Sequence, residues 1–71
     1  MTAPAAPELS ARQLDVLRLM AEGLTDRQIA GRLGVSPGTV ASHTLELYSR
    51  LGARNRAHAV ALGFRRRILT M

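Results

Sequence analysis

Arginine dominates the polar chemistry of this 71-residue chain: all ten cationic side chains are arginines, five carboxylates oppose them, and the formal net charge is +5. A guanidinium group can donate two parallel hydrogen bonds to one phosphate, so a small domain with this charge balance is biased toward anionic partners. We favour nucleic acid over a membrane surface as that partner. The alternative is a charged surface that serves only solubility.

Other reactive residue types are few. The chain has no cysteine, which excludes disulfides and thiolate zinc sites. Its two histidines and its serines are expected to have local structural roles, and none is spaced as a metal site or as a nucleophile with its base. We therefore predict no enzymatic activity, no metal and no cofactor.

The length of the chain limits its architecture to one domain, and a compact all-α fold is the expected class. No apolar run approaches the ~20 residues that span a membrane, and the N-terminus lacks the features of a signal peptide, so we expect a cytoplasmic protein. Residues 1–8 are rich in proline and alanine and predict a disordered leader or a linker remnant. Residues 9–71 form the predicted domain.

Helices must position the arginines, and two closely spaced helices are predicted between residues 24 and 52. Thr25 is the predicted N-cap of the first helix, Gln28 completes a capping box, and Gly34 ends the helix in the left-handed conformation. The buried stripe of this short helix consists of Ile29, Ala30 and Leu33.

The second helix of the pair starts only a few residues later. Ser36 is its N-cap, Pro37 occupies its first position and Gly52 stops it. Its apolar stripe recurs with helical period at Val40, Thr44, Leu47 and Leu51. Two helices joined by so short a turn indicate a helix-turn-helix, whose second helix enters the major groove of duplex DNA. The residues on the opposite face, which would then look into the groove, are Ala41, Ser42, Leu45, Glu46 and Ser49.

One further helix is predicted on each side of this pair. The first runs from the N-cap Ser10 to Gly23, with a capping-box partner at Gln13. Its expected buried stripe consists of Val16, Leu17, Met20 and Ala21. The last helix follows the N-cap Asn55. Its expected buried stripe consists of Ala57, Val60, Ala61, Phe64 and Ile68. The four helices are expected to contain about 12, 9, 15 and 13 residues.

With these elements in place, the sequence resembles the LuxR/GerE-type DNA-binding domain of bacterial transcription regulators. The resemblance runs from Leu9 to about Leu69 and is carried by LSARQLDVLRLMAEGLTDRQIAGRLGVSPGTVASH and by LYSRLGARNRAHAV. It implies a four-helix domain in which the third helix, about residues 37–51, reads the major groove and the fourth helix pairs two copies on a two-fold site. In this family the domain usually follows a phosphoacceptor receiver or a ligand-sensing domain. We therefore expect an excised domain or a small stand-alone regulator.

Roles for individual side chains follow from the pattern and the resemblance. Arg27 matches the family's cation on the DNA backbone, with a surface ion pair to Asp26 or Glu22 as the alternative. The hydroxyls expected to contact phosphate at the helix starts are those of Thr25, Ser36 and Thr39. The arginines expected to line the DNA backbone at the end of the third helix are Arg50, Arg54 and Arg56. The residues off the fourth helix's stripe, which are expected to form the dimer interface, are Ala59, Leu62, Gly63 and Arg66.

The predicted reading face also supports a function of a different class. Ala41 stands where such regulators commonly carry lysine or arginine, and Leu45 and Glu46 replace polar or basic residues. None of these side chains attracts phosphate, so the second hypothesis is a protein-interaction or adaptor module with a degenerate DNA-reading face. Region 4 of a sigma factor shares the helix-turn-helix pattern. A capped, amphipathic helix after Gly52 disfavours that third assignment.

Overall fold

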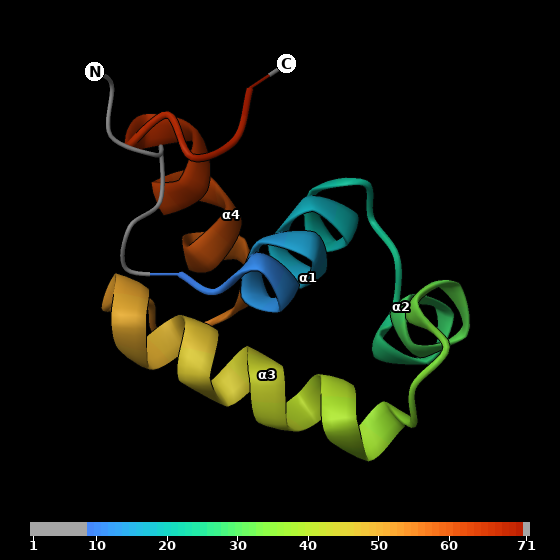
Figure 1. The fold of residues 1–71 in the computed structure, drawn as a ribbon. Coiled ribbons are helices and arrows are strands. Elements are labelled where there is room, and N and C mark those ends of the chain that lie inside the picture. Colours follow the sequence, from blue (N-terminus) through green and yellow to red (C-terminus); the bar gives the residue numbers. More distant parts are fainter. Residues whose placement is uncertain (1–8, 71) are drawn as a thin grey trace.

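The computed structural model describes residues 9–70, and in that range the chain forms four α-helices and no strand (Figure 1). The helices are α1 (Ala11–Ala21), α2 (Asp26–Leu33), α3 (Pro37–Leu51) and α4 (Arg56–Arg65). The predicted all-α class, a compact four-helix domain containing a helix-turn-helix, is confirmed. The leader predicted over residues 1–8 lies outside the described residues.

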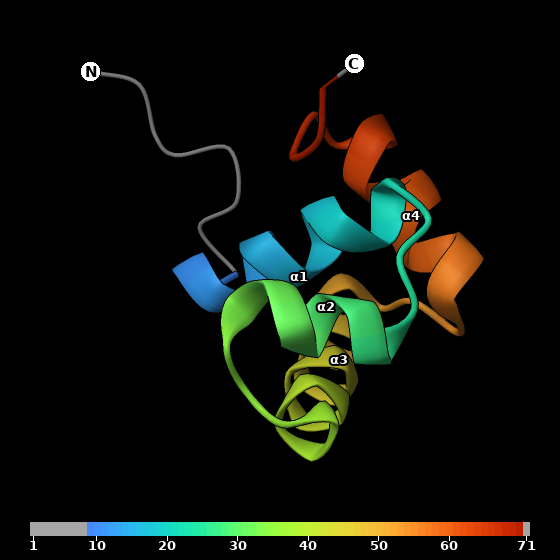
Figure 2. The same ribbon diagram turned by 90° about the vertical axis from the view of Figure 1, so that its right-hand side faces the viewer.

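Helices α1 and α3 are central to the arrangement, because each of them contacts all three other helices. In Figure 1, α3 lies along the lower edge of the molecule beneath α1, with α2 beyond its first turn and α4 above its last turns. Figure 2 shows α3 nearly end-on, below α2 and α1. One long side of α3 therefore faces the other helices, and the other long side faces away from them.

Side chains cap the first two helices as the sequence predicts. The Ser10 hydroxyl accepts the backbone N–H of Gln13 at 3.1 Å, and the side-chain amide oxygen of Gln13 accepts the Ser10 N–H at 3.0 Å. Thr25 and Gln28 make the same reciprocal pair at 3.2 and 2.8 Å. Both capping boxes satisfy backbone donors that a helix start leaves unpaired, so both helices begin at defined residues.

The turn between α2 and α3 is stabilised by a left-handed glycine and local hydrogen bonds. Gly34 has φ 69° and ψ 33°, the left-handed conformation that glycine adopts at low cost. The Val35 N–H donates to the carbonyl oxygen of Ala30 at 3.1 Å, and the Ser36 hydroxyl accepts the Thr39 N–H at 3.1 Å. The side chain of Ala30 is only 3% exposed. A methyl group is the largest side chain expected to fit where two helices cross so close to a turn.

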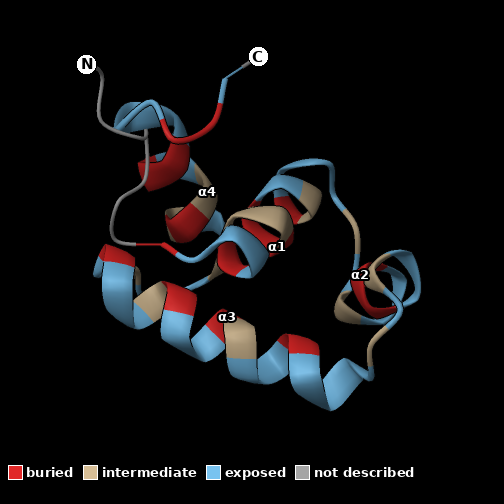
Figure 3. Ribbon diagram, in the orientation of Figure 1, coloured by how far each residue is buried: buried red, intermediate tan, exposed pale blue. Residues whose placement is uncertain are grey.

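The core lies between the four helices, with Ile29 and Ala30 contributed by α2. The predicted stripe of α3 is confirmed, since its buried residues are Val40, Thr44, Leu47 and Leu51. Figure 3 shows this stripe on the side of α3 that faces the other helices. The stripe of α1 is confirmed in part, because Ala21 is exposed and the fourth buried position is taken by Gln13.

The inward face predicted for α4 is wrong. Three members of the expected stripe are exposed: Ala57, Ala61 and Phe64. The residues that α4 buries instead are Ala59, Leu62 and Gly63. Nearly every central residue of this helix is small or apolar, so two different stripes fit the helical period. Tertiary packing decides between the two stripes.

A C-terminal hook, residues 66–70, follows α4 and makes that helix shorter than predicted. Arg67 has φ 60°, a left-handed conformation that stops the helix. The N–H groups of Ile68 and Leu69 both donate to the carbonyl oxygen of Gly63, at 2.8 and 2.9 Å. Both side chains are then buried, each 6% exposed. The buried position of Ile68 is confirmed, but the residue reaches the core from the hook and not from the helix.

Candidate nucleic-acid interface

The outward face of α3 consists of the five residues that the sequence assigned to the groove: Ala41, Ser42, Leu45, Glu46 and Ser49. All five are exposed, and Leu45 reaches 69% exposure. Figure 3 shows exposed residues along the side of α3 turned away from α1. An α-helix with its side chains is about 10–12 Å wide, close to the ~12 Å width of the major groove of B-DNA. Nothing in the described fold covers this face.

The outward face of α3 offers hydroxyl and methyl groups and only one charge. The hydroxyls of Ser42 and Ser49 can donate to or accept from base edges. Ala41 and Leu45 can contact the methyl group of thymine. Phosphate attraction must come from other elements, because this face carries no cation.

The carboxylate of Glu46 has a partner inside the domain. The side-chain amide of Gln13 donates to it at 3.5 Å, and Gln13 itself is only 3% exposed. Sequence analysis missed this contact, although a polar residue within the stripe of α1 was a signal for it. Gln13 therefore both caps α1 and connects α1 to α3.

Hydroxyl groups are placed at the N-termini of α2 and α3. The Thr25 hydroxyl caps α2, and the Ser36 hydroxyl caps α3 and lies 3.0 Å from the hydroxyl of Thr39. All of these side chains are exposed. The capping roles are confirmed, and the hydroxyls can still contact a phosphate where the helix dipoles favour an anion.

Three exposed arginines lie in or directly beside the helix-turn-helix. Arg27 lies in the first turn of α2 and is exposed. Of its two alternative partners, Asp26 pairs with Arg56 instead, and within residues 9–70 Arg27 forms no ion pair with Asp26 or Glu22. Arg50, in the last turn of α3, and Arg54, just beyond it, are also exposed.

The expected DNA contact of Arg56 is not favoured by its surroundings. Its guanidinium group donates to the Asp26 carboxylate at 3.4 Å and to the carbonyl oxygen of Leu24. Burial raises the pKa of the nearby Tyr48 above its ordinary value of 10.0; Arg56 lowers it and Asp26 adds to the rise. This group of side chains connects α4 and α3 to the start of α2.

The four residues expected to form a dimer interface on α4 do not form an exposed face, so this assignment is wrong. Ala59 is 0% exposed, Leu62 is 7% exposed and Gly63 is buried. Arg66 reaches back to donate to the carbonyl oxygen of Leu51 at 2.9 Å. The cause is the rotation of α4 described above. The apolar residues that α4 leaves at the surface are Ala57, Ala61 and Phe64, with Val60 half-buried.

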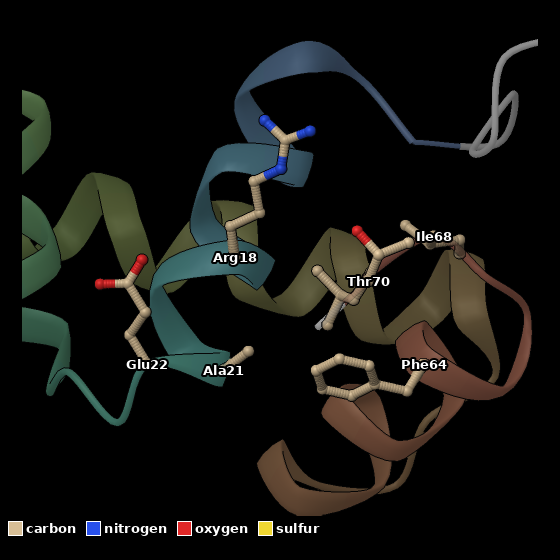
Figure 4. A pocket seen from close by; sticks show the side chains of 7 residues that line it. Arg18, Ala21, Glu22, Phe64, Ile68 and Thr70 are labelled. Carbon is tan, nitrogen blue, oxygen red and sulfur yellow. The ribbon is translucent and has the colours of Figure 1, made fainter.

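A hollow of about 350 Å³ lies between α1 and the C-terminal hook (Figure 4). Its lining residues are Arg18, Ala21, Glu22, Phe64, Ile68, Leu69 and Thr70. None of them belongs to the helix-turn-helix. Among residues 9–70, no three histidine, aspartate or glutamate side chains gather as a metal site requires, and no helix there could cross a bilayer.

A capped helix-turn-helix with an exposed second helix is the arrangement found in DNA-binding domains of transcription regulators. The family described as "Bacterial regulatory proteins, luxR family" matches residues 7–62, and the chain belongs to this family. The resemblance found in the sequence is thereby confirmed.

Relatives and a solved structure agree with this assignment. The chain is 48% identical over 67 residues to the "Probable transcriptional regulatory protein NarL" of Mycobacterium tuberculosis, covering 94% of this chain and 31% of that protein. It is 50% identical over 54 residues to the "Probable transcriptional regulatory protein SgaR" of Hyphomicrobium methylovorum, covering 76% of this chain and 26% of that protein. The response regulator ChrA of a heme-sensing two-component system superposes with a TM-score of 0.83 at 38% identity, covering 86% of this chain and 30% of that one. The chain thus spans less than a third of the length of each of these proteins.

Proposed function

We propose that this domain binds duplex DNA sequence-specifically with α3 in the major groove, as a dimer paired through α4, and thereby regulates transcription. The observation that carries the proposal is the exposure of the whole outward face of α3, opposite a stripe that is buried in the core. A helix held in this way can enter a groove without any rearrangement of the domain. Because bacterial DNA lies in the cytoplasm, the domain would act there.

Phosphate contacts in this proposal come from both ends of α3. The hydroxyls of Ser36 and Thr39 at its start would contact one strand, together with Thr25 and Arg27 from the start of α2. At its end, Arg50 and Arg54 face the other strand. A helix of 15 residues is about 22 Å long, so these two groups can straddle the groove. The serines and apolar residues between them would then read the bases.

The surface proposed for pairing on α4 consists of Ala57, Val60, Ala61 and Phe64. Phe64 is 37% exposed, and a large aromatic side chain beside small residues can anchor a close helix contact. Two copies related by a two-fold axis would place their α3 helices about 34 Å apart, one turn of DNA. The relatives are longer regulators, so we further propose an upstream receiver or sensory domain that controls this pairing.

A selection from random duplexes at low salt, followed by mobility-shift titrations at several salt concentrations, tests DNA binding. We expect one preferred two-fold sequence and an affinity that falls steeply with salt. Arg27→Ala and Arg54→Ala should each weaken binding. Each should also reduce the slope of log affinity against log salt concentration by about 0.9 for every bound copy of the domain. Arg18→Ala is the matched control, since Arg18 lies at the hollow between α1 and the hook and should leave the slope unchanged. Absence of salt-sensitive binding by the wild-type domain would overturn the proposal.

Pairing is tested separately on a bound duplex. Phe64→Asp should convert the two-copy complex into a one-copy complex and should leave binding to an isolated half-site unchanged. If two copies of the Phe64→Asp variant still bind the duplex cooperatively, the proposed surface on α4 is not the pairing surface.

The adaptor function is supported by one observation, the exposure of the large apolar Leu45 beside the carboxylate of Glu46. It predicts that the selection retains no duplex even at low salt. It also predicts that Leu45→Ser abolishes association with the partner protein. If the wild-type domain binds a preferred duplex and Leu45→Ser alters the selected bases, the adaptor hypothesis is wrong.

A further inference from the structure

Arg56 connects three parts of the domain through one side chain. It lies in the first turn of α4, donates to the carbonyl oxygen of Leu24 before α2, and pairs with Asp26 at the first position of α2. We call this set of contacts the Arg56 clamp. The side chain of Arg56 is 36% exposed and that of Asp26 is 47% exposed, so solvent reaches the ion pair only in part.

The residues held by the Arg56 clamp adjoin the proposed phosphate-binding residues of α2. Leu24 precedes Thr25, and Asp26 precedes Arg27. A displacement of the backbone at residues 24–26 therefore moves both groups proposed to anchor the domain on DNA. A guanidinium group suits this position, because its planar donors can serve a carbonyl oxygen and a carboxylate at the same time.

We propose that Arg56 is a positioning residue that fixes the N-terminus of α2 for phosphate binding and does not itself contact DNA. This inference rests on the proposed function only for its effect on DNA affinity. The clamp itself exists in the free domain and can be measured there. Its second effect is to neutralise the carboxylate of Asp26, which would otherwise face the phosphates beside Arg27.

The free domain provides the first test, by amide hydrogen exchange. The N–H of Gln28 donates to the Thr25 hydroxyl and that of Ile29 donates to the Thr25 carbonyl oxygen. Arg56→Gln should raise the exchange rates of these two amides. Arg66→Gln is the matched control, because Arg66 also donates to a backbone carbonyl oxygen, but to that of Leu51 at the end of α3. If Arg56→Gln leaves both amides as protected as the control does, the clamp is refuted whether or not the domain binds DNA.

The sign of the effect of Asp26→Asn on DNA affinity provides the second test. If Arg56 contacts phosphate, removing its carboxylate partner frees it and binding becomes tighter. If Arg56 acts through Asp26, binding becomes weaker by about two- to five-fold, the range expected for a partly exposed ion pair. Asp15→Asn is the matched control, since Asp15 forms a 4.0 Å ion pair with Arg12 in α1 and its loss changes the net charge equally. We expect this control to bind as well as the wild-type domain or slightly better.

A double variant separates the clamp from the effect of a carboxylate at a helix start. Asp26→Asn should weaken DNA binding in the wild-type background. In the Arg56→Gln background it should strengthen binding slightly, because the carboxylate there is no longer neutralised and repels the phosphates. Arg56→Lys should give a DNA affinity between those of the wild-type domain and Arg56→Gln. A single ammonium group lacks the planar, spaced donors with which the guanidinium group serves two acceptors. Tighter binding by Asp26→Asn in the wild-type background, or an equal loss in both backgrounds, would overturn the inference.

Discussion

Leu69 packs directly on the α-carbon of Gly63. A Cβ atom added to residue 63 would lie 2.8 Å from Cδ1 of Leu69 and 3.2 Å from Cδ2 of Leu17. The same glycine accepts the N–H groups of Ile68 and Leu69 with its carbonyl oxygen. The absence of a side chain at residue 63 therefore allows the C-terminal hook to close over α4 and α1.

Replacement of Gly63 by alanine should destabilise the domain, although alanine favours a helix by about 1 kcal/mol. Overpacking a filled core costs about 1–3 kcal/mol, so the clash should exceed the gain. Gly31→Ala is the matched control, because α2 leaves open space at that position and the helix gain remains. Thermal unfolding should show a lower Tm for Gly63→Ala and a higher Tm for Gly31→Ala. A rise of equal size in both variants would show that the hook does not pack on Gly63.

Thr44→Val should stabilise the domain. The Thr44 hydroxyl is buried in the stripe of α3 and finds no hydrogen-bond partner among residues 9–70, an arrangement that costs about 1–3 kcal/mol. Valine has nearly the same shape without the polar atom, so denaturant unfolding should give a larger free energy of unfolding. Thr44→Ser keeps the hydroxyl, loses a methyl group and should be less stable than the wild-type domain. A loss of stability on Thr44→Val would mean that the hydroxyl is satisfied in solution.

Tyr48 should make the stability of the domain depend on alkaline pH. Burial raises the pKa of its phenol in the folded state above the ordinary value of 10.0, so the folded domain favours the protonated form. That contribution is fully present below pH 10 and is lost as the pH rises through the raised pKa of the folded state. Urea unfolding across this range should show a fall in stability that Tyr48→Phe reduces. An unchanged pH profile in the Phe variant would assign the fall to other groups.

Glu46→Gln should raise the affinity for duplex DNA in general. The amide oxygen can still accept from Gln13, so α1 and α3 stay connected, and the repulsion between a carboxylate and the phosphates is removed. Mobility-shift titrations with an unrelated duplex should show the gain, with the melting temperature unchanged. A weaker complex with the preferred sequence alone would instead indicate that Glu46 accepts a hydrogen bond from a base, as from the amino group of cytosine.

Much of the fold could be predicted because local signals and core packing agree. The caps at Ser10, Thr25, Ser36 and Asn55 are short-range features that the sequence displays directly. The stripe of α3 was equally clear, since polar residues separate its apolar positions. The exposure of the outward face then followed from helical geometry alone.

The remaining errors concern tertiary contacts. In α4, the apolar residues surround the helix, so packing against α1, α3 and Leu69 selects the buried side. The ion pair of Arg56 with a carboxylate 30 residues away leaves no local pattern. From the sequence alone, an arginine near a predicted DNA surface is expected to contact phosphate, and only its tertiary partners show another role.

The central claim is that the outward face of α3 contacts DNA. NMR titration of the labelled domain with its selected duplex tests it most directly, by following the amide signals of Ser42, Leu45 and Ser49. We predict large shifts at these residues and at Arg27, with the signals of Ile68 and Leu69 in the hook nearly unchanged. Shifts confined to the hook and α1, with the signals of α3 unperturbed, would contradict the account.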